Sequence, residues 1–129
     1  MIEGFWSGVD GPRHDQMPQV LAEAYRTINP DPDDFRRMFE LDLSVMRGFV
    51  DFENDRLASI DVPTLFLSGD RDVVQPEHTL AMARAVRSGR ALILPAGHGD
   101  YLGAADAGAP DPVLTASSLG LIGRFLDEE

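Results

Sequence analysis

The sequence predicts an α/β fold, in which helices accompany a small parallel sheet. Two short apolar runs, at residues 64–67 and 91–94, have the unbroken texture of strands that are buried on both faces. The segment between them has Pro76 near its start and Gly89 just beyond its end, a pattern that brackets a helix. Strand, helix and strand in this order are expected to form a parallel pair with a right-handed crossover.

Two amphipathic helices are expected before the first strand. In the first, apolar residues recur at the helical spacing between Leu21 and Ile28, and Asn29 followed by Pro30 stops the pattern. The second begins with an acidic first turn at residues 33–34, which suits the positive end of a helix dipole. Its apolar residues share one face and comprise Phe35, Phe39, Leu43, Met46 and Val50.

The spacing of apolar residues changes at Leu57. This change divides the chain into a helical region, residues 1–56, and a second region, residues 57–129. After the strand–helix–strand unit, the second region is expected to end in a helix that starts near Asp111. The residues expected to face inward from that helix are Leu114, Leu121, Ile122, Phe125 and Leu126. In the first region, an aromatic and methionine stripe is expected to be core rather than a ligand pocket; it comprises Phe35, Met38, Phe39 and Met46.

Composition excludes several classes of function. Acidic residues outnumber basic ones by 22 to 11, and a formal charge of −11 repels phosphate backbones and anionic lipids, so nucleic acid and membranes are not expected as partners. All basic residues are arginine and there is no cysteine, which excludes lysine nucleophiles, disulfides, thiolates and zinc–thiolate sites. No cofactor and no metal are expected, because the acids at residues 31–34 read as a solvated helix start rather than a calcium loop. The N-terminus shows no secretion-signal pattern, and a cytoplasmic protein is expected.

Two loops that follow the expected strands carry the chemically useful side chains. The first loop contains Asp70 and Asp72, and the second contains His98 between two glycines. The carboxyl ends of neighbouring parallel strands lie at one edge of a sheet, which is where ligands bind in open α/β folds. A carboxylate at that edge can accept the Nδ1 proton of an imidazole and leave Nε2 free as a general base. The pattern therefore indicates an acid–histidine pair.

These residues resemble the C-terminal signature of the α/β-hydrolase superfamily. The resemblance rests on Pro-Thr-Leu-Phe-Leu-Ser-Gly-Asp-Arg-Asp at residues 63–72, on Pro76, and on Leu-Pro-Ala-Gly-His-Gly at residues 94–99. It implies that Asp72 is the acid and His98 the base of a catalytic triad. Their order also agrees with that of the family, which runs nucleophile, acid, histidine along the chain.

The same resemblance implies that residues 1–56 correspond to the helical cap of such enzymes. Aromatic side chains of the cap often line the acyl pocket in the family. The candidates for that role in this chain are Phe5, Trp6, Phe39 and Phe49.

The nucleophile of the family is missing from the sequence. No Gly-x-Ser-x-Gly pentapeptide occurs, because Ser7 lies one place late between Gly4 and Gly8, and the only His-Gly pair belongs to the base loop. The chain therefore resembles a truncated gene, an expressed fragment or a trimmed relative, and it is expected to be inactive alone. Two functions stay open. One is a relative of ester- or acyl-cleaving hydrolases that acts on a small apolar or acyl substrate once completed. The other is a non-catalytic module that binds a partner or an apolar ligand.

The remaining polar candidates have plainer interpretations. Asp70 is expected to form a turn by hydrogen-bonding its own backbone. His14 and His78 are expected at the surface, and Ser7 is a poor substitute nucleophile because no strained strand-to-helix turn surrounds it. Since a two-stranded sheet cannot cover itself, the chain is expected to form a homo-oligomer or to bind an N-terminal hydrolase half in trans.

Overall fold

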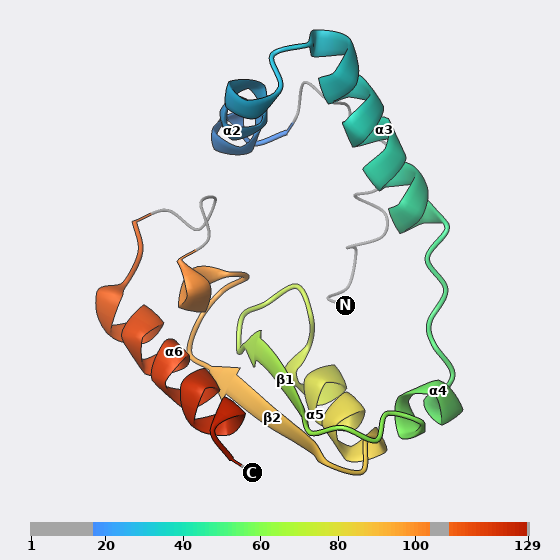
Figure 1. Ribbon diagram of the computed structural model, residues 1–129, viewed down its shortest axis with the longest axis vertical. Coiled ribbons are helices and arrows are strands. Elements are labelled where there is room, and N and C mark those ends of the chain that lie inside the picture. Colours follow the sequence, from blue (N-terminus) through green and yellow to red (C-terminus); the bar gives the residue numbers. More distant parts are fainter. Residues whose placement is uncertain (1–16, 104–108, 129) are drawn as a thin grey trace. The chain divides into compact units, whose positions relative to one another are not determined.

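The computed structural model describes residues 17–103 and 109–128 and shows helices together with a small parallel sheet (Figure 1). This mixed architecture agrees with the α/β class that the sequence predicts. The chain divides into two compact units after residue 51, and the α/β part belongs to the second. In the described ranges, no helix is long and apolar enough to cross a membrane.

The first unit contains two helices, α2 (Gln19–Ile28) and α3 (Pro32–Arg47). Asp31 caps α3, because its side chain accepts a hydrogen bond from the backbone N–H of Asp33 at 2.9 Å. Phe35 is 2% exposed and lies at the contact between the two helices. The Tyr25 ring lies against it with the ring centroids 5.5 Å apart, and the Arg26 guanidinium lies over its face at 4.7 Å. The contact between α2 and α3 is thus built around one phenylalanine.

The apolar stripe predicted for α3 includes one residue, Val50, that lies outside the helix. The helix ends at Arg47, where the backbone N–H of Gly48 bonds to the carbonyl of Ser44 and closes the last turn. Val50 lies beyond this end and is 78% exposed, so it does not belong to the buried face. The other members of the stripe are buried or half-buried.

The second unit contains α4 (Asn54–Ala58), β1 (Thr64–Gly69), α5 (Pro76–Ala85), β2 (Gly89–Leu94), a short 3-10 helix η2 (Asp100–Leu102) and α6 (Pro112–Leu126). The two strands are parallel, and Thr64 pairs with Gly89 and Gly69 with Leu94. This confirms the predicted parallel pair. The strands and the helices α5 and α6 form layers, with α5 against one face of the sheet and α6 over the other (Figure 1).

The best-buried part of the second unit lies at the carboxyl ends of the strands. Leu94, Ala96 and Tyr101 form the buried cluster, and Leu67, Leu92 and Leu114 pack against it. Asp111 caps α6 through hydrogen bonds from the backbone N–H groups of Val113 and Leu114. The core therefore lies directly beneath the two loops that carry the acid and the histidine.

The inward face predicted for α6 is only partly correct. Leu114, Ile122 and Phe125 are half-buried, but Leu121 is 41% exposed and Leu126 is 73% exposed. The sheet is two strands wide in the part of the chain that the structure describes, so it offers too little surface to cover the whole face of a four-turn helix.

Candidate active site

The carboxylate of Asp72 is buried in the turn that follows β1. Its side chain is 2% exposed, and it accepts hydrogen bonds from two backbone N–H groups of the same turn. Gly69 donates to Oδ2 at 3.2 Å and Val74 donates to Oδ1 at 3.4 Å. The turn therefore surrounds the charge with donors, as a buried carboxylate requires.

His98 meets this carboxylate from the loop that follows β2. Its Nδ1 lies 2.7 Å from Oδ1 of Asp72. Because an ionised carboxylate can only accept, Nδ1 carries the proton and Nε2 is the free nitrogen of the neutral ring. The side chain of His98 is 65% exposed, so a reacting group can reach the ring. The contact between Asp72 and His98 that the sequence predicts is confirmed, and their catalytic role stays a prediction.

Opposing effects determine the pKa of Asp72. Burial, the largest of them, raises it, but the hydrogen bond from His98, the backbone donors at Gly69 and Val74, and the charge of His98 together outweigh burial. The pKa of the Asp72 carboxyl is therefore lowered from its ordinary value. The group is ionised at neutral pH, which is the state that can orient an imidazole.

Tyr101 is a third member of the site that sequence reasoning missed. It is buried beneath the histidine loop, and its hydroxyl donates to Oδ2 of Asp72 at 3.5 Å. Burial raises the pKa of Tyr101, and the charge of Asp72 and the hydrogen bond to it act in the same direction. The only signal in the sequence is a tyrosine three residues after His98, whose hydroxyl needs a partner once the ring is buried.

Asp70 does not act as the sequence predicts. Its Oδ1 accepts a hydrogen bond from the backbone N–H of Ala96 at 3.0 Å, so its side chain bonds to the histidine loop instead of its own turn. The parallel register explains this, because Gly69 pairs with Leu94 and the residues that follow both strands continue side by side. The N–H of Asp70 also bonds to Leu94, and that of Arg71 to Ala96.

Gly69 allows the two loops to approach so closely. A Cβ atom at this position would lie 2.0 Å from the carbonyl oxygen of Ala96, far inside the contact distance of two atoms. A side chain there would push the loop after β2, which carries His98, away from the loop after β1, which carries Asp72. The glycine before Asp70 therefore has a packing role that its place in a turn does not reveal.

The other residues singled out in the sequence lie away from this pair. His78 is exposed in the first turn of α5, as predicted. Of the aromatic candidates for an acyl pocket, Phe39 is half-buried on α3 and Phe49 is 49% exposed after it. Phe5, Trp6, Ser7 and His14 lie outside the described residues. Within the described ranges, no group of three or more histidine, aspartate or glutamate side chains is arranged to hold a metal ion.

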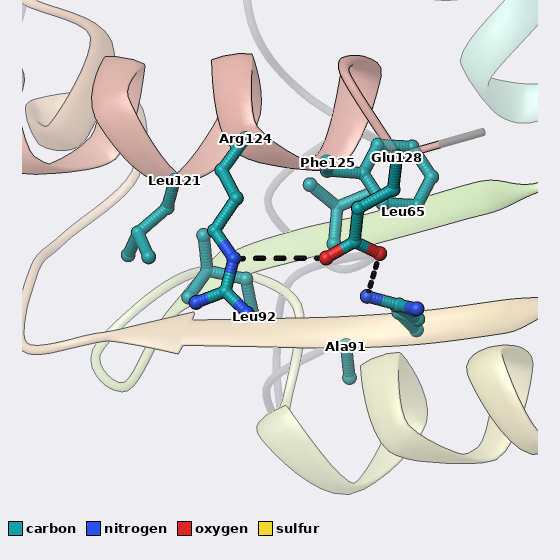
Figure 2. A pocket seen from close by; sticks show the side chains of 8 residues that line it. Leu65, Ala91, Leu92, Leu121, Arg124, Phe125 and Glu128 are labelled. Carbon is teal, nitrogen blue, oxygen red and sulfur yellow. Dashed lines mark ion pairs between the residues drawn. The ribbon is translucent and has the colours of Figure 1, made fainter.

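A hollow of about 220 Å³ lies between α6 and the strands (Figure 2). Leu65, Leu92, Leu121 and Phe125 supply its apolar lining. At its rim, Glu128 forms ion pairs with Arg90 and Arg124, the latter at 3.6 Å. Neither Asp72 nor His98 lines this hollow, so the pair and the hollow are separate features.

No family model, no curated protein and no solved structure matches the chain. The resemblance to α/β-hydrolases therefore rests on the motifs between residues 57 and 103 and remains a prediction.

Proposed function

We propose that the second unit is part of an α/β-hydrolase fold and supplies the acid and the base of its triad. One observation carries the proposal: Asp72 and His98 come from the carboxyl ends of adjacent parallel strands and meet at 2.7 Å. Asp72 fixes the tautomer of the ring, and Nε2 of His98 then accepts the proton of an attacking hydroxyl group. The imidazolium that forms is stabilised by the buried charge of Asp72.

In this proposal the nucleophile and the oxyanion donors come from outside these 129 residues. The substrate class is a small apolar ester or another acyl compound, since acyl transfer is the chemistry that an activated hydroxyl performs. The completing partner is an N-terminal hydrolase half, joined to the chain or supplied in trans. The 129-residue chain alone is expected to hold an oriented base without a nucleophile for it to activate.

The test begins with the genomic reading frame before the codon of Met1. If the frame continues and encodes Gly-x-Ser-x-Gly, the extended protein is expected to react with a fluorophosphonate probe for serine nucleophiles. Labelling is expected to disappear in the His98→Ala variant of the extended protein, and the 129-residue chain is expected to remain unlabelled. An in-frame stop codon would leave only the form of the proposal in which the N-terminal half is supplied in trans. Labelling that His98→Ala leaves unchanged would count against the proposal.

A second candidate function is a non-catalytic module that binds an apolar ligand or a partner. The observation in its favour is the apolar hollow beneath α6, which is separate from the acid–histidine pair. Binding of a fluorescent apolar probe that is lost in Leu92→Asp but retained in His98→Ala would favour this function.

A further inference from the structure

The histidine loop is held by a carboxylate on each side. Two consecutive backbone N–H groups precede His98, and each donates to an aspartate. Ala96 donates to Oδ1 of Asp70 at 3.0 Å, and Gly97 donates to Oδ2 of Asp100 at 2.7 Å. Asp70 belongs to the loop after β1 and Asp100 to η2, so the loop is fixed from two different segments.

These bonds matter because little else fixes the imidazole of His98. Its side chain is 65% exposed, so packing against neighbours does not hold the ring. Its orientation depends on the backbone that carries it and on the single hydrogen bond to Asp72. Hydrogen bonds from an amide to an ionised carboxylate are shorter and stronger than neutral ones, and a displacement of about 1 Å at such a site is enough to disturb its chemistry.

We propose that Asp70 and Asp100 are positioning residues that hold His98 in register with Asp72. The proposal rests on the proposed function, in which Asp72 and His98 are the acid and the base. The ring of His98 is hydrogen-bonded to Asp72, whereas Asp70 and Asp100 each act through a backbone N–H group of the loop. The turn at residues 69–72 thus contains two aspartates with different roles: Asp72 accepts the hydrogen bond of the ring, and Asp70 holds the loop that carries His98.

The experiment reads the tautomer of His98 directly in the 129-residue chain. Histidine is labelled with ¹⁵N, and the ring signals of His98 are assigned by their loss in His98→Gln. The wild-type ring is expected to be protonated at Nδ1, because Asp72 accepts that proton. In Asp70→Ala and in Asp100→Ala, the preference for Nδ1 is expected to be lost.

Matched variants separate positioning from a general loss of structure. Asp70→Asn keeps a carbonyl oxygen that can accept from Ala96, so it is expected to restore the Nδ1-protonated ring. Asp61→Ala, at an exposed aspartate before β1, is expected to change nothing. The signals of His78 on α5 report whether the fold persists in each variant. If Asp70→Ala unfolds, Asp70→Glu displaces the acceptor by one methylene and is expected to shift the tautomer in the same direction.

An Nδ1-protonated His98 in folded Asp70→Ala and Asp100→Ala, or in folded Asp70→Glu, would overturn the positioning proposal. Asp72→Ala, which removes the acceptor of the Nδ1 proton, distinguishes this failure from that of the proposed function. If Asp72→Ala shifts the tautomer while Asp70→Ala and Asp100→Ala do not, the acid–histidine pair stands and only the positioning roles are wrong. If Asp72→Ala leaves the tautomer unchanged, the pair itself is absent and both proposals fail.

Discussion

At the scale of the residue, Asp72 shows how a buried charge is made tolerable. Removing a carboxylate from water is costly, and here the cost is met by donors from Gly69, Val74, His98 and Tyr101. Two of these donors are backbone groups of the same turn. The turn therefore supplies two donors to the charge by itself, whereas His98 and Tyr101 come from the segment after β2.

The lowered pKa of Asp72 makes a prediction about stability in acid. The ordinary value is 3.8 and the folded value lies below it, so the unfolded chain binds the proton first as pH falls. The stabilisation from Asp72 is present above pH 3.8 and is lost as pH falls through the folded pKa. In Asp72→Asn, the free energy of unfolding is expected to be about 1–3 kcal/mol lower at pH 7 and to fall less between pH 5 and pH 2. Urea titrations across this range measure both effects.

Asp61→Asn is the matched control for the acid titration, because Asp61 is exposed and follows no strand. It is expected to keep the pH dependence of the wild-type chain. If Asp72→Asn also keeps that dependence, the carboxylate of Asp72 is not stabilised in the folded state and the site described above is incorrect.

A second prediction at this scale concerns catalysis by the chain alone. The 129-residue chain is expected to hydrolyse p-nitrophenyl acetate no faster than its His98→Ala variant. A base without a positioned nucleophile and without oxyanion donors loses most of the rate advantage of a triad. Initial rates for the two proteins at equal concentration provide the comparison. Turnover well above background that disappears in Ser7→Ala would instead show a rearranged site with its own nucleophile.

At the scale of the element, local signals located the two strands and the helices α2, α3, α5 and α6, but they missed the short helices α4 and η2. The helices α5 and α6 begin within one residue of Pro76 and Asp111, the starts that the sequence predicts. The two apolar runs lie inside the observed strands. The partner of Asp70 was not predictable in this way. Its bond to Ala96 depends on the register between strands that are more than twenty residues apart, and no local pattern encodes that register.

The same register makes a prediction about Gly69. Gly69→Ala would place a methyl group 2.0 Å from the carbonyl oxygen of Ala96, so the two loops must separate. The free energy of unfolding is expected to fall by about 1–3 kcal/mol, the usual cost of overpacking. The ¹⁵N signals of His98 are expected to change as well, because the loop that carries the ring must move.

Gly120→Ala is the matched control for this steric effect. Gly120 lies within α6 and a Cβ there meets nothing within 4 Å, so the substitution is expected to stabilise the helix by about 1 kcal/mol. Chemical denaturation of both variants measures the two opposite changes. Equal stability of Gly69→Ala and the wild-type chain would show that the loops are not in the contact described.

At the scale of the whole molecule, the sheet has more apolar surface and more strand edge than the described residues cover. The N–H of Thr64 bonds to Ser88 and that of Asp70 to Leu94. The backbone N–H and C=O groups of every second residue of β1, starting at Thr64, therefore point towards β2. Leu65 and Leu67 therefore direct their backbone groups to the opposite edge, where no described strand pairs with them. Such an edge is a template for pairing with another chain.

Exposed apolar side chains occur in both units, among them Leu41, Val45, Leu119 and Leu126, each more than half exposed. Burial of such side chains against a second copy of the chain would favour association. The net charge of −11 opposes association at low ionic strength, and added salt is expected to weaken that repulsion.

We therefore expect the chain to self-associate, most simply as a symmetric dimer in which two β1 edges pair. Light scattering behind a sizing column is expected to give a mass above the 14.1 kDa of the monomer at micromolar concentration, and a larger associated fraction in salt. Leu65→Pro removes a backbone donor from the outer edge of β1 and is expected to weaken this association. Leu65→Ala, which shortens the same side chain but keeps the backbone donor, serves as the matched control. A folded wild-type chain that remains at the monomer mass throughout would contradict the prediction, because the two-stranded sheet would then be covered by the chain itself.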